Sequence, residues 1–198
     1  MAQVLAVITT SVDGYITGPR DGPGEGLGEG GERLHNWVFG GPWKYGEDAR
    51  PRPTGEDAQW LAQATAGLGA VVAGRGTYEA ARHWGEQNPW GVPFFIVTHR
   101  PEEQPESGQF VFVSGVSAAV QRAIEAAGKK DVHIMGGGEV IRQALAAGIV
   151  DDLTLIVAPV VMGAGKRLFD GFAQSLDLEQ LGVRQSQFAT FIDYRVRR

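Results

Sequence analysis

The sequence of 198 residues contains no cysteine. This absence excludes disulfide bonds, thiolate metal sites and cysteine nucleophiles, and it also excludes a zinc deaminase module, whose metal site needs cysteine ligands. The chain also lacks a G-x-S-x-G nucleophile elbow. A metal site is not expected either, because the histidines show neither i, i+4 nor clustered spacing: they are His35, His83, His99 and His133.

Long apolar runs and an excess of positive charge are lacking as well. The apolar run from Val4 to Ile8 has no basic flank and is too short for a signal peptide or a membrane span, so we expect a cytoplasmic protein without a membrane partner. A net charge of −5 argues against a nucleic-acid partner. With 43% apolar and 21% charged residues, the composition is that of an ordinary globular protein. At this length we expect one domain, residues 1–198.

Glycine, in contrast, is abundant, and two glycine clusters stand between an apolar strand and a helical pattern. They lie at Val71 to Thr77 (VVAGRGT) and at His133 to Ile141 (HIMGGGEVI). Residues without a Cβ let a ligand approach the backbone, and the following helix start offers free N–H groups to a phosphate. Tight packing would also use glycine, but Gly136, Gly137 and Gly138 exceed what packing alone requires. Two such junctions indicate a dinucleotide.

Basic side chains follow two of the predicted strand ends. Arg75 comes directly after Gly74, and the next strand runs into Thr98, His99 and Arg100. In an α/β sheet, ligands bind outside the carboxyl ends of the strands, and a guanidinium can form a two-pronged contact with a phosphate. A surface salt bridge explains Arg75 about as well when that residue is taken alone. Two separate strand ends that carry arginine favour phosphate binding.

Two aspartates are candidates for proton transfer or substrate orientation. Asp13 belongs to an Asp-Gly turn after the first strand, where it either makes the turn or faces the ligand, and the sequence favours neither. Asp57 is the last residue of the segment from Thr54 to Asp57, and this segment resembles a capping box at the start of a helix. It either caps its own helix, which is slightly favoured, or points into the cleft as a proton source. We therefore expect Asp13 to be the more important acid.

A segment dense in glycine and proline, residues 18–53, follows the first strand. Irregular segments of this length are uncommon in compact domains and are often lids or substrate loops, so we expect a lid or substrate loop here. A short helix is expected within it, from about Glu32 to Phe39. Trp37 and Trp43 in this segment, together with Tyr15, can stack on a flat substrate ring, although core packing explains each of them equally well.

The C-terminal part of the chain has a different pattern. Strands alternate with helices as far as an apolar strand from Leu153 to Met162, which suits the sheet centre. Two strands then follow one another, Leu176 to Leu181 and Phe188 to Val196. This order predicts an α/β fold with a mainly parallel central sheet and antiparallel C-terminal strands. An open apolar sheet edge is usually covered, so we expect a homodimer through the last strands, on account of Phe188, Phe191, Ile192 and Tyr194.

Five segments, spread over nearly the whole chain, carry a family resemblance. They are SVDGYI (Ser11 to Ile16), VVAGRGTYE (Val71 to Glu79), FFIVTHR (Phe94 to Arg100), IMGGGEVI (Ile134 to Ile141) and DDLTLIVAPVVMGAGKRLF (Asp151 to Phe169). In this order they resemble the dihydrofolate reductase superfamily. More narrowly, the chain resembles stand-alone reductases related to the C-terminal domain of bacterial riboflavin-biosynthesis deaminase/reductase. Any one segment is weak, but five in family order are fairly specific.

The resemblance implies a three-layer α/β/α, dihydrofolate-reductase-like fold that binds NADPH. It implies that Gly136, Gly137 and Gly138 lie along the pyrophosphate, and in dihydrofolate reductases the first two of these glycines are joined by a cis peptide bond. The cofactor-binding residues that we expect from it are Gly74, Arg75 and Thr77 toward the adenosine half, Thr98, His99 or Arg100 at the 2′-phosphate, and the glycine turn with Glu139 and Val140. Met135 stands where pyrimidine reductases usually carry an acidic residue that contacts the substrate.

The activity that the resemblance implies is that of an NADPH-dependent reductase of the riboflavin-biosynthesis type, similar to 5-amino-6-(5-phosphoribosylamino)uracil reductase. Hydride would pass to a C=N or C=O group on a nitrogen heterocycle or its ribosyl arm, while the protein holds the cofactor and aligns this small-molecule substrate. Asp13 or Asp57 would orient the substrate or relay a proton. The alternatives are dihydrofolate reduction and a catalytically silent NADPH-binding protein.

Overall fold

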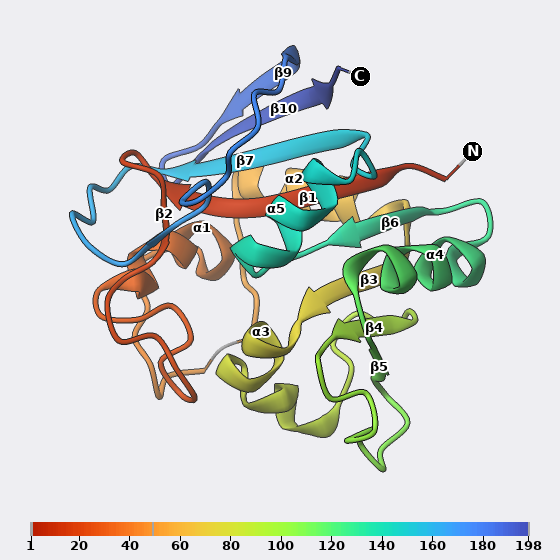
Figure 1. Ribbon diagram of the computed structural model, residues 1–198. Coiled ribbons are helices and arrows are strands. Elements are labelled where there is room, and N and C mark those ends of the chain that lie inside the picture. The colour runs from red at the N-terminus through yellow and green to blue at the C-terminus, as the bar shows by residue number, and fades with distance from the viewer. Residues whose placement is uncertain (1, 49, 198) are drawn as a thin grey trace.

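The computed structural model describes residues 2–48 and 50–197, and an eight-stranded sheet forms its centre (Figure 1). The strands are β1 (Val4–Ser11), β3 (Leu68–Gly74), β4 (Phe94–Val97), β5 (Val111–Val113), β6 (Asp131–Ile134), β7 (Asp152–Ala158), β9 (Leu178–Gln185) and β10 (Thr190–Val196). Their order across the sheet is β5-β4-β3-β6-β1-β7-β10-β9. Neighbours from β5 to β7 run parallel, whereas β10 is antiparallel to both β7 and β9. The predicted sheet, parallel with antiparallel C-terminal strands, is confirmed.

Helices cover both faces of this sheet. On one face, α4 (Val116–Ala127) and α5 (Gly138–Ala146) pack on the largest apolar core. On the other face, α2 (Gly55–Ala66) places Trp60 against Phe191 of β10. Because neighbouring side chains of a strand point to opposite faces, β1 can supply Val4 to the first core and Val7 to the second. This is the expected three-layer α/β/α fold.

The bounds of several elements differ from their sequence-based prediction: among the last strands, β9 ends at Gln185 rather than at Leu181, and β10 begins at Thr190 rather than at Phe188. β7 ends at Ala158 rather than at Met162, because Pro159 has no N–H to donate and the chain turns there, with Val160 N bonding to Ala158 O at 2.7 Å. This strand also lies between β1 and β10 rather than at the sheet centre. The helix expected from Thr77 to about His83 is α3 (Arg75–Ala80), which begins two residues earlier and ends at Ala80, because residues 82–86 adopt left-handed torsions with φ between 48° and 63°.

Two loops meet at the carboxyl ends of the parallel strands. The chain after β1 forms β2 (Tyr15–Thr17), which pairs antiparallel with β8 (Lys166–Arg167) in the loop after β7. Within the segment 18–53, the 3₁₀ helix η1 (Gly31–His35) and α1 (Asn36–Phe39) stand where the short helix was predicted. In the part of the chain that the structure describes, no helix is both long and apolar enough to cross a membrane.

Candidate functional site

The two strand–glycine–helix junctions that the sequence predicts lie side by side. They belong to the neighbouring parallel strands β3 and β6. Gly74 N donates a hydrogen bond to Gly136 O at 3.0 Å, and Met135 N donates to Val72 O at 3.0 Å. The junctions are packed so closely that a Cβ on Gly74 would lie 3.0 Å from Val140 Cγ2. They therefore form one continuous edge, which a single elongated ligand can span.

The glycine turn after β6 is less tightly surrounded at its first two residues than at its third. The peptide bond between Gly136 and Gly137 is cis, as the resemblance implies, and Gly136 has a φ of +103°. The nearest atom to a Cβ added at Gly136 or Gly137 would be Thr77 Oγ1, at 3.6 and 3.4 Å. A Cβ on Gly138, in contrast, would lie 2.8 Å from Ile16 Cδ1. The first two glycines therefore leave room for a ligand beside the Thr77 hydroxyl, whereas the third is required by packing.

Helix α5 begins at this turn. Gly137 is its N-cap and, within the described chain, makes no side-chain capping bond, so the first N–H groups of the helix are available to a ligand. Glu139 is exposed, and its carboxylate accepts hydrogen bonds from Arg142 at 2.5 Å and from Gln143 at 2.8 Å. Val140 is buried in the core. Of these two predicted cofactor residues, Val140 thus packs against the other junction and Glu139 faces solvent.

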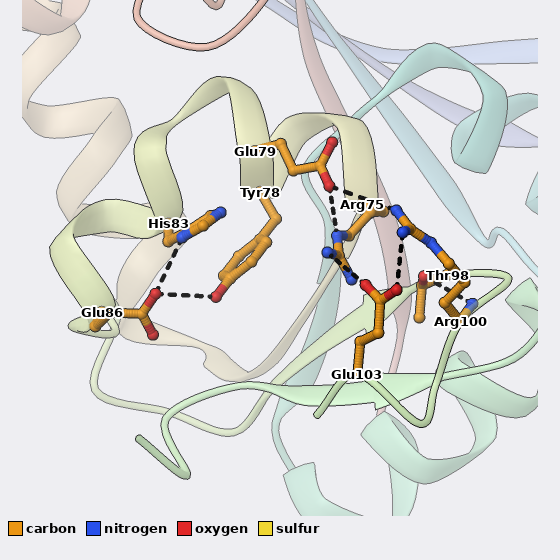
Figure 2. A network of polar contacts seen from close by, with 8 residues as sticks. All are labelled: Arg75, Tyr78, Glu79, His83, Glu86, Thr98, Arg100 and Glu103. Atoms are coloured by element: carbon orange, nitrogen blue, oxygen red, sulfur yellow. Dashed lines mark hydrogen bonds and ion pairs between the residues drawn. The ribbon is translucent and has the colours of Figure 1, made fainter. Parts of the chain in front are cut away.

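Four charged side chains form a cluster at the ends of β3 and β4, which we call the arginine–glutamate cluster: Arg75, Glu79, Arg100 and Glu103 (Figure 2). Arg75 Nε donates to Glu79 Oε1 at 2.7 Å, and Arg75 Nη2 donates to Glu103 Oε2 at 3.0 Å. Arg100 Nη1 donates to Glu103 Oε1 at 2.8 Å. The predicted phosphate ligands Arg75 and Arg100 therefore lie together, and both are paired with carboxylates.

Thr98 and His99 connect this cluster to β4. Thr98 is buried, and its hydroxyl accepts a hydrogen bond from Arg100 N at 3.1 Å, which fixes the backbone that carries the arginine (Figure 2). His99 is exposed. On the other side of the cluster, the Arg75 guanidinium lies over the Phe112 ring at 4.7 Å. The predicted 2′-phosphate contacts are thus placed on one surface, with Thr98 beneath it.

Sequence reasoning missed Glu79 and Glu103. Glu79 lies one helical turn after Arg75, at the i+4 position. Glu103 lies in the turn after Arg100, at the i+3 position. Charge spacing of this kind is a recognised signal for ion pairing. The surface salt bridge considered for Arg75 is therefore present.

Asp13 connects the end of β1 to the loop after β7. Its carboxylate accepts hydrogen bonds from the Ser11 hydroxyl at 2.6 Å, from Met162 N at 3.0 Å and from Gly163 N at 2.8 Å. These bonds, that of Ser11 above all, lower the pKa of Asp13 to about 2. A carboxyl with this pKa carries no proton at neutral pH, so the structure does not favour Asp13 as a proton donor.

Asp57 has the opposite environment. Its side chain is 1% exposed, and its Oδ1 has no hydrogen-bond partner among the residues that the structure describes. Burial raises the pKa of Asp57 above its ordinary value; a hydrogen bond from Ser186 opposes this rise and the nearby Glu56 charge adds to it.

The capping role that was slightly favoured for Asp57 is wrong. The N-cap residue Thr54 makes no side-chain capping bond within the described chain. Gly55 follows it with a φ of +55°, so the chain enters α2 through a left-handed residue instead of the extended-to-helical step of a capping box.

Strand register places Asp57 near the same sheet edge as the glycine turn. Asp57 and Ser186 line one small pocket of about 230 Å³, and Ser186 precedes β10, whose first residue pairs with Val157 near the carboxyl end of β7. β1 pairs with β7 as far as Ser11 but with β6 only as far as Ala6. Beyond Ala6 the glycine turn lies beside β1, and a Cβ on Gly136 would be 3.7 Å from Ile8 Cδ1.

Of the four predicted substrate-binding residues, Trp37 and Tyr15 are buried, whereas Trp43 and Met135 are half-buried. Trp37 is buried in the core beneath α2, and its Nε1 donates to Thr9 Oγ1 at 3.1 Å. Tyr15 is buried and its hydroxyl bonds to Gly163 O at 3.2 Å. Trp43 stacks on Phe39 at 4.5 Å, and Met135 packs at the margin of a core. Core packing thus accounts for Trp37 and Tyr15, while a role of these four in substrate binding stays a prediction.

The residues at this edge fit a dinucleotide. The space above Gly136 and Gly137 is a cradle that Cβ atoms would fill, and α5 presents its N-terminus there. Arg75 Nη1 is buried and has no partner among the described residues, so this donor remains for an anion.

Comparison with known proteins identifies the family. The family model of the RibD C-terminal domain matches residues 2–188, and the chain belongs to this family. Two Bacillus subtilis proteins are similar in sequence: YyaP is 36% identical over 55 residues, and YwjB is 25% identical over 125 residues. These matches cover 28% and 63% of this chain, and they span 29% of YyaP and 71% of YwjB.

Solved structures with the same fold include three from other bacteria. A protein assigned to riboflavin biosynthesis from Shewanella sp. PV-4 has a TM-score of 0.74 at 23% identity, with all of both chains covered. Dihydrofolate reductase from Enterococcus faecalis, solved with NADP(H), has a TM-score of 0.65 at 16% identity, covering 99% of this chain and 97% of its own. A pyrimidine reductase-like protein from Corynebacterium diphtheriae has a TM-score of 0.62 at 18% identity, covering 100% and 92%. The dihydrofolate-reductase-like fold is confirmed.

Proposed function

We propose that this protein is an NADPH-dependent reductase of the riboflavin-biosynthesis type. The observation that carries the proposal is the close packing of two strand–glycine–helix junctions, joined by the hydrogen bond from Gly74 to Gly136. Membership of the RibD C-terminal domain family supports a reductase. The acceptor would be a C=N or C=O group of a nitrogen heterocycle or its ribosyl arm.

The cofactor would be held by groups from both junctions. Gly136, Gly137 and the start of α5 would receive the pyrophosphate, with the Thr77 hydroxyl beside it. Arg75 and Arg100 would receive the 2′-phosphate, because a guanidinium pairs with a phosphate through two parallel N–H bonds. When bound, the reduced nicotinamide supplies a hydride. The protein itself contributes orientation and the exclusion of water.

Asp57 is the residue that we propose for proton transfer. Its burial favours the protonated carboxyl, and one of its oxygens is free of protein partners among the described residues, so it can hold a proton for a ring nitrogen of the substrate. Asp13 would instead hold the loop after β7 in place. This assignment favours dihydrofolate reduction as the second candidate function, because the resemblance implies that the helix of Asp57 corresponds to the helix that bears the acid in dihydrofolate reductases.

Cofactor oxidation separates these functions. The purified protein would be mixed with NADPH and with either a 5-amino-6-ribosylaminouracil phosphate or dihydrofolate, and the absorbance of the reduced nicotinamide would be followed. We expect oxidation with the aminouracil substrate. Oxidation with dihydrofolate alone would favour the second candidate. NADPH binding without oxidation across a broad panel of heterocycles would favour the catalytically silent protein.

We also propose a homodimer, although its surface differs from the expected one. Phe191 is fully buried in the core of its own chain. The exposed apolar side chains lie instead on the edge strand β9, where Leu181 is 46% and Val183 is 50% exposed. Open edges of this kind are usually paired or covered. Light scattering at micromolar concentration should give the mass of two chains, and a monomer would contradict the proposal.

A further inference from the structure

One carboxylate already bridges the two arginines of the arginine–glutamate cluster. Glu103 accepts from Arg75 Nη2 at 3.0 Å through one oxygen and from Arg100 Nη1 at 2.8 Å through the other (Figure 2). Guanidinium groups pair with carboxylates and with phosphates through the same donor geometry. Glu103 therefore lies where a phosphate that binds both arginines would have to lie.

The two glutamates of the cluster differ in how they are anchored. Glu79 stands one turn after Arg75 in α3 and bonds to its Nε at 2.7 Å, so it orients the guanidinium from within the same helix. Glu103 belongs to the exposed turn after β4, where its N–H bonds to Arg100 O at 3.2 Å. Both glutamate side chains are 39% exposed, so the difference between them lies in position. Of the two, only Glu103 accepts hydrogen bonds from both arginines, and it comes from a turn outside the helix that carries Arg75.

The charge of the cluster is balanced as long as Glu103 remains in it. Two guanidinium groups face two carboxylates, so a phosphate approaching the cluster gains little net attraction. One donor is nevertheless left over: Arg75 Nη1 is buried and has no partner within the described residues. A ligand oxygen that replaced Glu103 would find both arginines and this additional donor.

We propose that Glu103 is a specificity-determining residue of the dinucleotide site. In the free protein it occupies the arginine pair, and it lowers the preference for a dinucleotide with a 2′-phosphate over one with a free 2′-hydroxyl. The 2′-hydroxyl of a dinucleotide can donate a hydrogen bond to the Glu103 carboxylate in its present position, whereas a 2′-phosphate has to displace that carboxylate. The inference rests on the proposed function, because it takes the adenosine end of the cofactor to lie at this cluster.

The test compares Glu103→Gln with Glu102→Gln, which removes the same charge at the adjacent position. Calorimetric titrations would use NADPH, NADH, adenosine 2′-monophosphate and adenosine 5′-monophosphate, so that binding is read without turnover. Glu103→Gln should bind NADPH and adenosine 2′-monophosphate about fivefold more tightly, the scale of a partly screened like-charge contact. The affinities for NADH and adenosine 5′-monophosphate should stay within about twofold. Glu102→Gln should leave all four affinities near those of the parent.

Two results would overturn the inference: an unchanged ratio of NADPH to NADH affinity in Glu103→Gln, or the same gain in Glu102→Gln. If the parent binds NADPH but Glu103→Gln binds it no more tightly than the parent does, the proposed function stands and this inference alone is wrong. If the parent binds neither dinucleotide, the proposed function is wrong and the inference falls with it. Should Glu103→Gln not fold, Glu103→Asp provides the second variant, because its shorter side chain cannot reach both arginines.

Discussion

Two regions near the carboxyl end of β1, which we call its two flanks, differ in the hydrogen-bond partners of their polar groups. One flank contains β6 and β3, and the other contains α2. On the flank of β6 and β3, the groups are backbone N–H donors and mutually paired charges at the surface, such as Arg75 with Glu103. On the flank of α2, there is a single buried carboxyl, Asp57, with an unpartnered oxygen among the described residues. Groups that can exchange partners suit binding, whereas a carboxyl kept out of water suits proton transfer. We therefore propose that the first of these flanks binds the cofactor and that the second carries the chemistry.

The largest effect that we expect comes from Gly137→Val, which should abolish the binding of both dinucleotides. A Cβ at this position meets only Thr77 Oγ1, at 3.4 Å, so the free protein has room for it. The added methyl groups would occupy the space proposed for the pyrophosphate. Calorimetry measures the loss, with Gly182→Ala in β9 as the control, because no atom lies within 4 Å of a Cβ there and the strand is remote from both junctions. Normal NADPH affinity in Gly137→Val would show that the glycine turn serves packing alone.

Asp57→Asn should separate chemistry from binding. We expect kcat to fall about a hundredfold, the scale of a lost acid–base group, while the affinity for NADPH stays unchanged. Steady-state kinetics and calorimetry on the same preparation check both statements. Asp13→Asn is the matched control, and it should retain most of the activity. An inactive Asp13→Asn beside an active Asp57→Asn would reverse our assignment of the two carboxyl groups.

Stability gives an independent test of the Asp57 environment. Because burial raises the pKa of Asp57, its contribution to folding is present below the pKa of the unfolded chain and is lost as the pH rises through the raised pKa. Asparagine has no charge to bury, so the melting temperature of Asp57→Asn at neutral pH should be no lower than that of the parent. A clear decrease would indicate a structural role, such as the helix capping that the structure does not show.

A smaller effect is expected at the arginine–glutamate cluster. Arg100→Ala should reduce the preference for NADPH over NADH by about tenfold, because one charge-assisted hydrogen bond to a phosphate is worth roughly 1.5–3 kcal/mol. Competition binding with both cofactors measures the ratio. The affinity for NADH should change little. Equal losses of NADPH and NADH affinity in Arg100→Ala would contradict the assignment of the 2′-phosphate to this cluster.

The smallest effect concerns the loop that Asp13 holds. Its hydrogen bonds lower the folded-state pKa from 3.8 to about 2, so the stability that they give is present above pH 3.8 and is lost as the pH falls toward 2. Asp13→Asn should therefore flatten the acid limb of a melting-temperature profile. It should also expose residues 159–165 to limited proteolysis at neutral pH. A profile identical to that of the parent would show that the Asp13 bonds add nothing to stability.

Much of the fold could be predicted from local patterns. The alternation of apolar runs and helical periodicity located the strands and helices, and the strand-to-glycine transitions located both junctions. The ends of the elements were harder to predict, because β7 stops at Pro159 and α3 stops at a left-handed turn, two features that depend on packing around them.

The candidate site was predictable only where its residues are close in sequence. The glycine turn and the arginines follow directly from strand ends. The environment of Asp13 depends on Met162 and Gly163, which lie about 150 residues further along the chain. The environment of Asp57 depends on Ser186 and on the torsion of Gly55. Neither environment could be read from neighbouring residues, so the order that we propose from the structure is the reverse of the order expected from the sequence.

The central claim is that both junctions bind one dinucleotide, and hydrogen–deuterium exchange tests it most directly. Backbone amides of the parent protein would be followed with and without saturating NADPH. We predict that the cofactor slows exchange together at residues 74–77 and at residues 136–140, with little change around Trp90, which precedes the amino end of β4. Protection confined to one junction, or absent from both while NADPH is bound, would contradict the account.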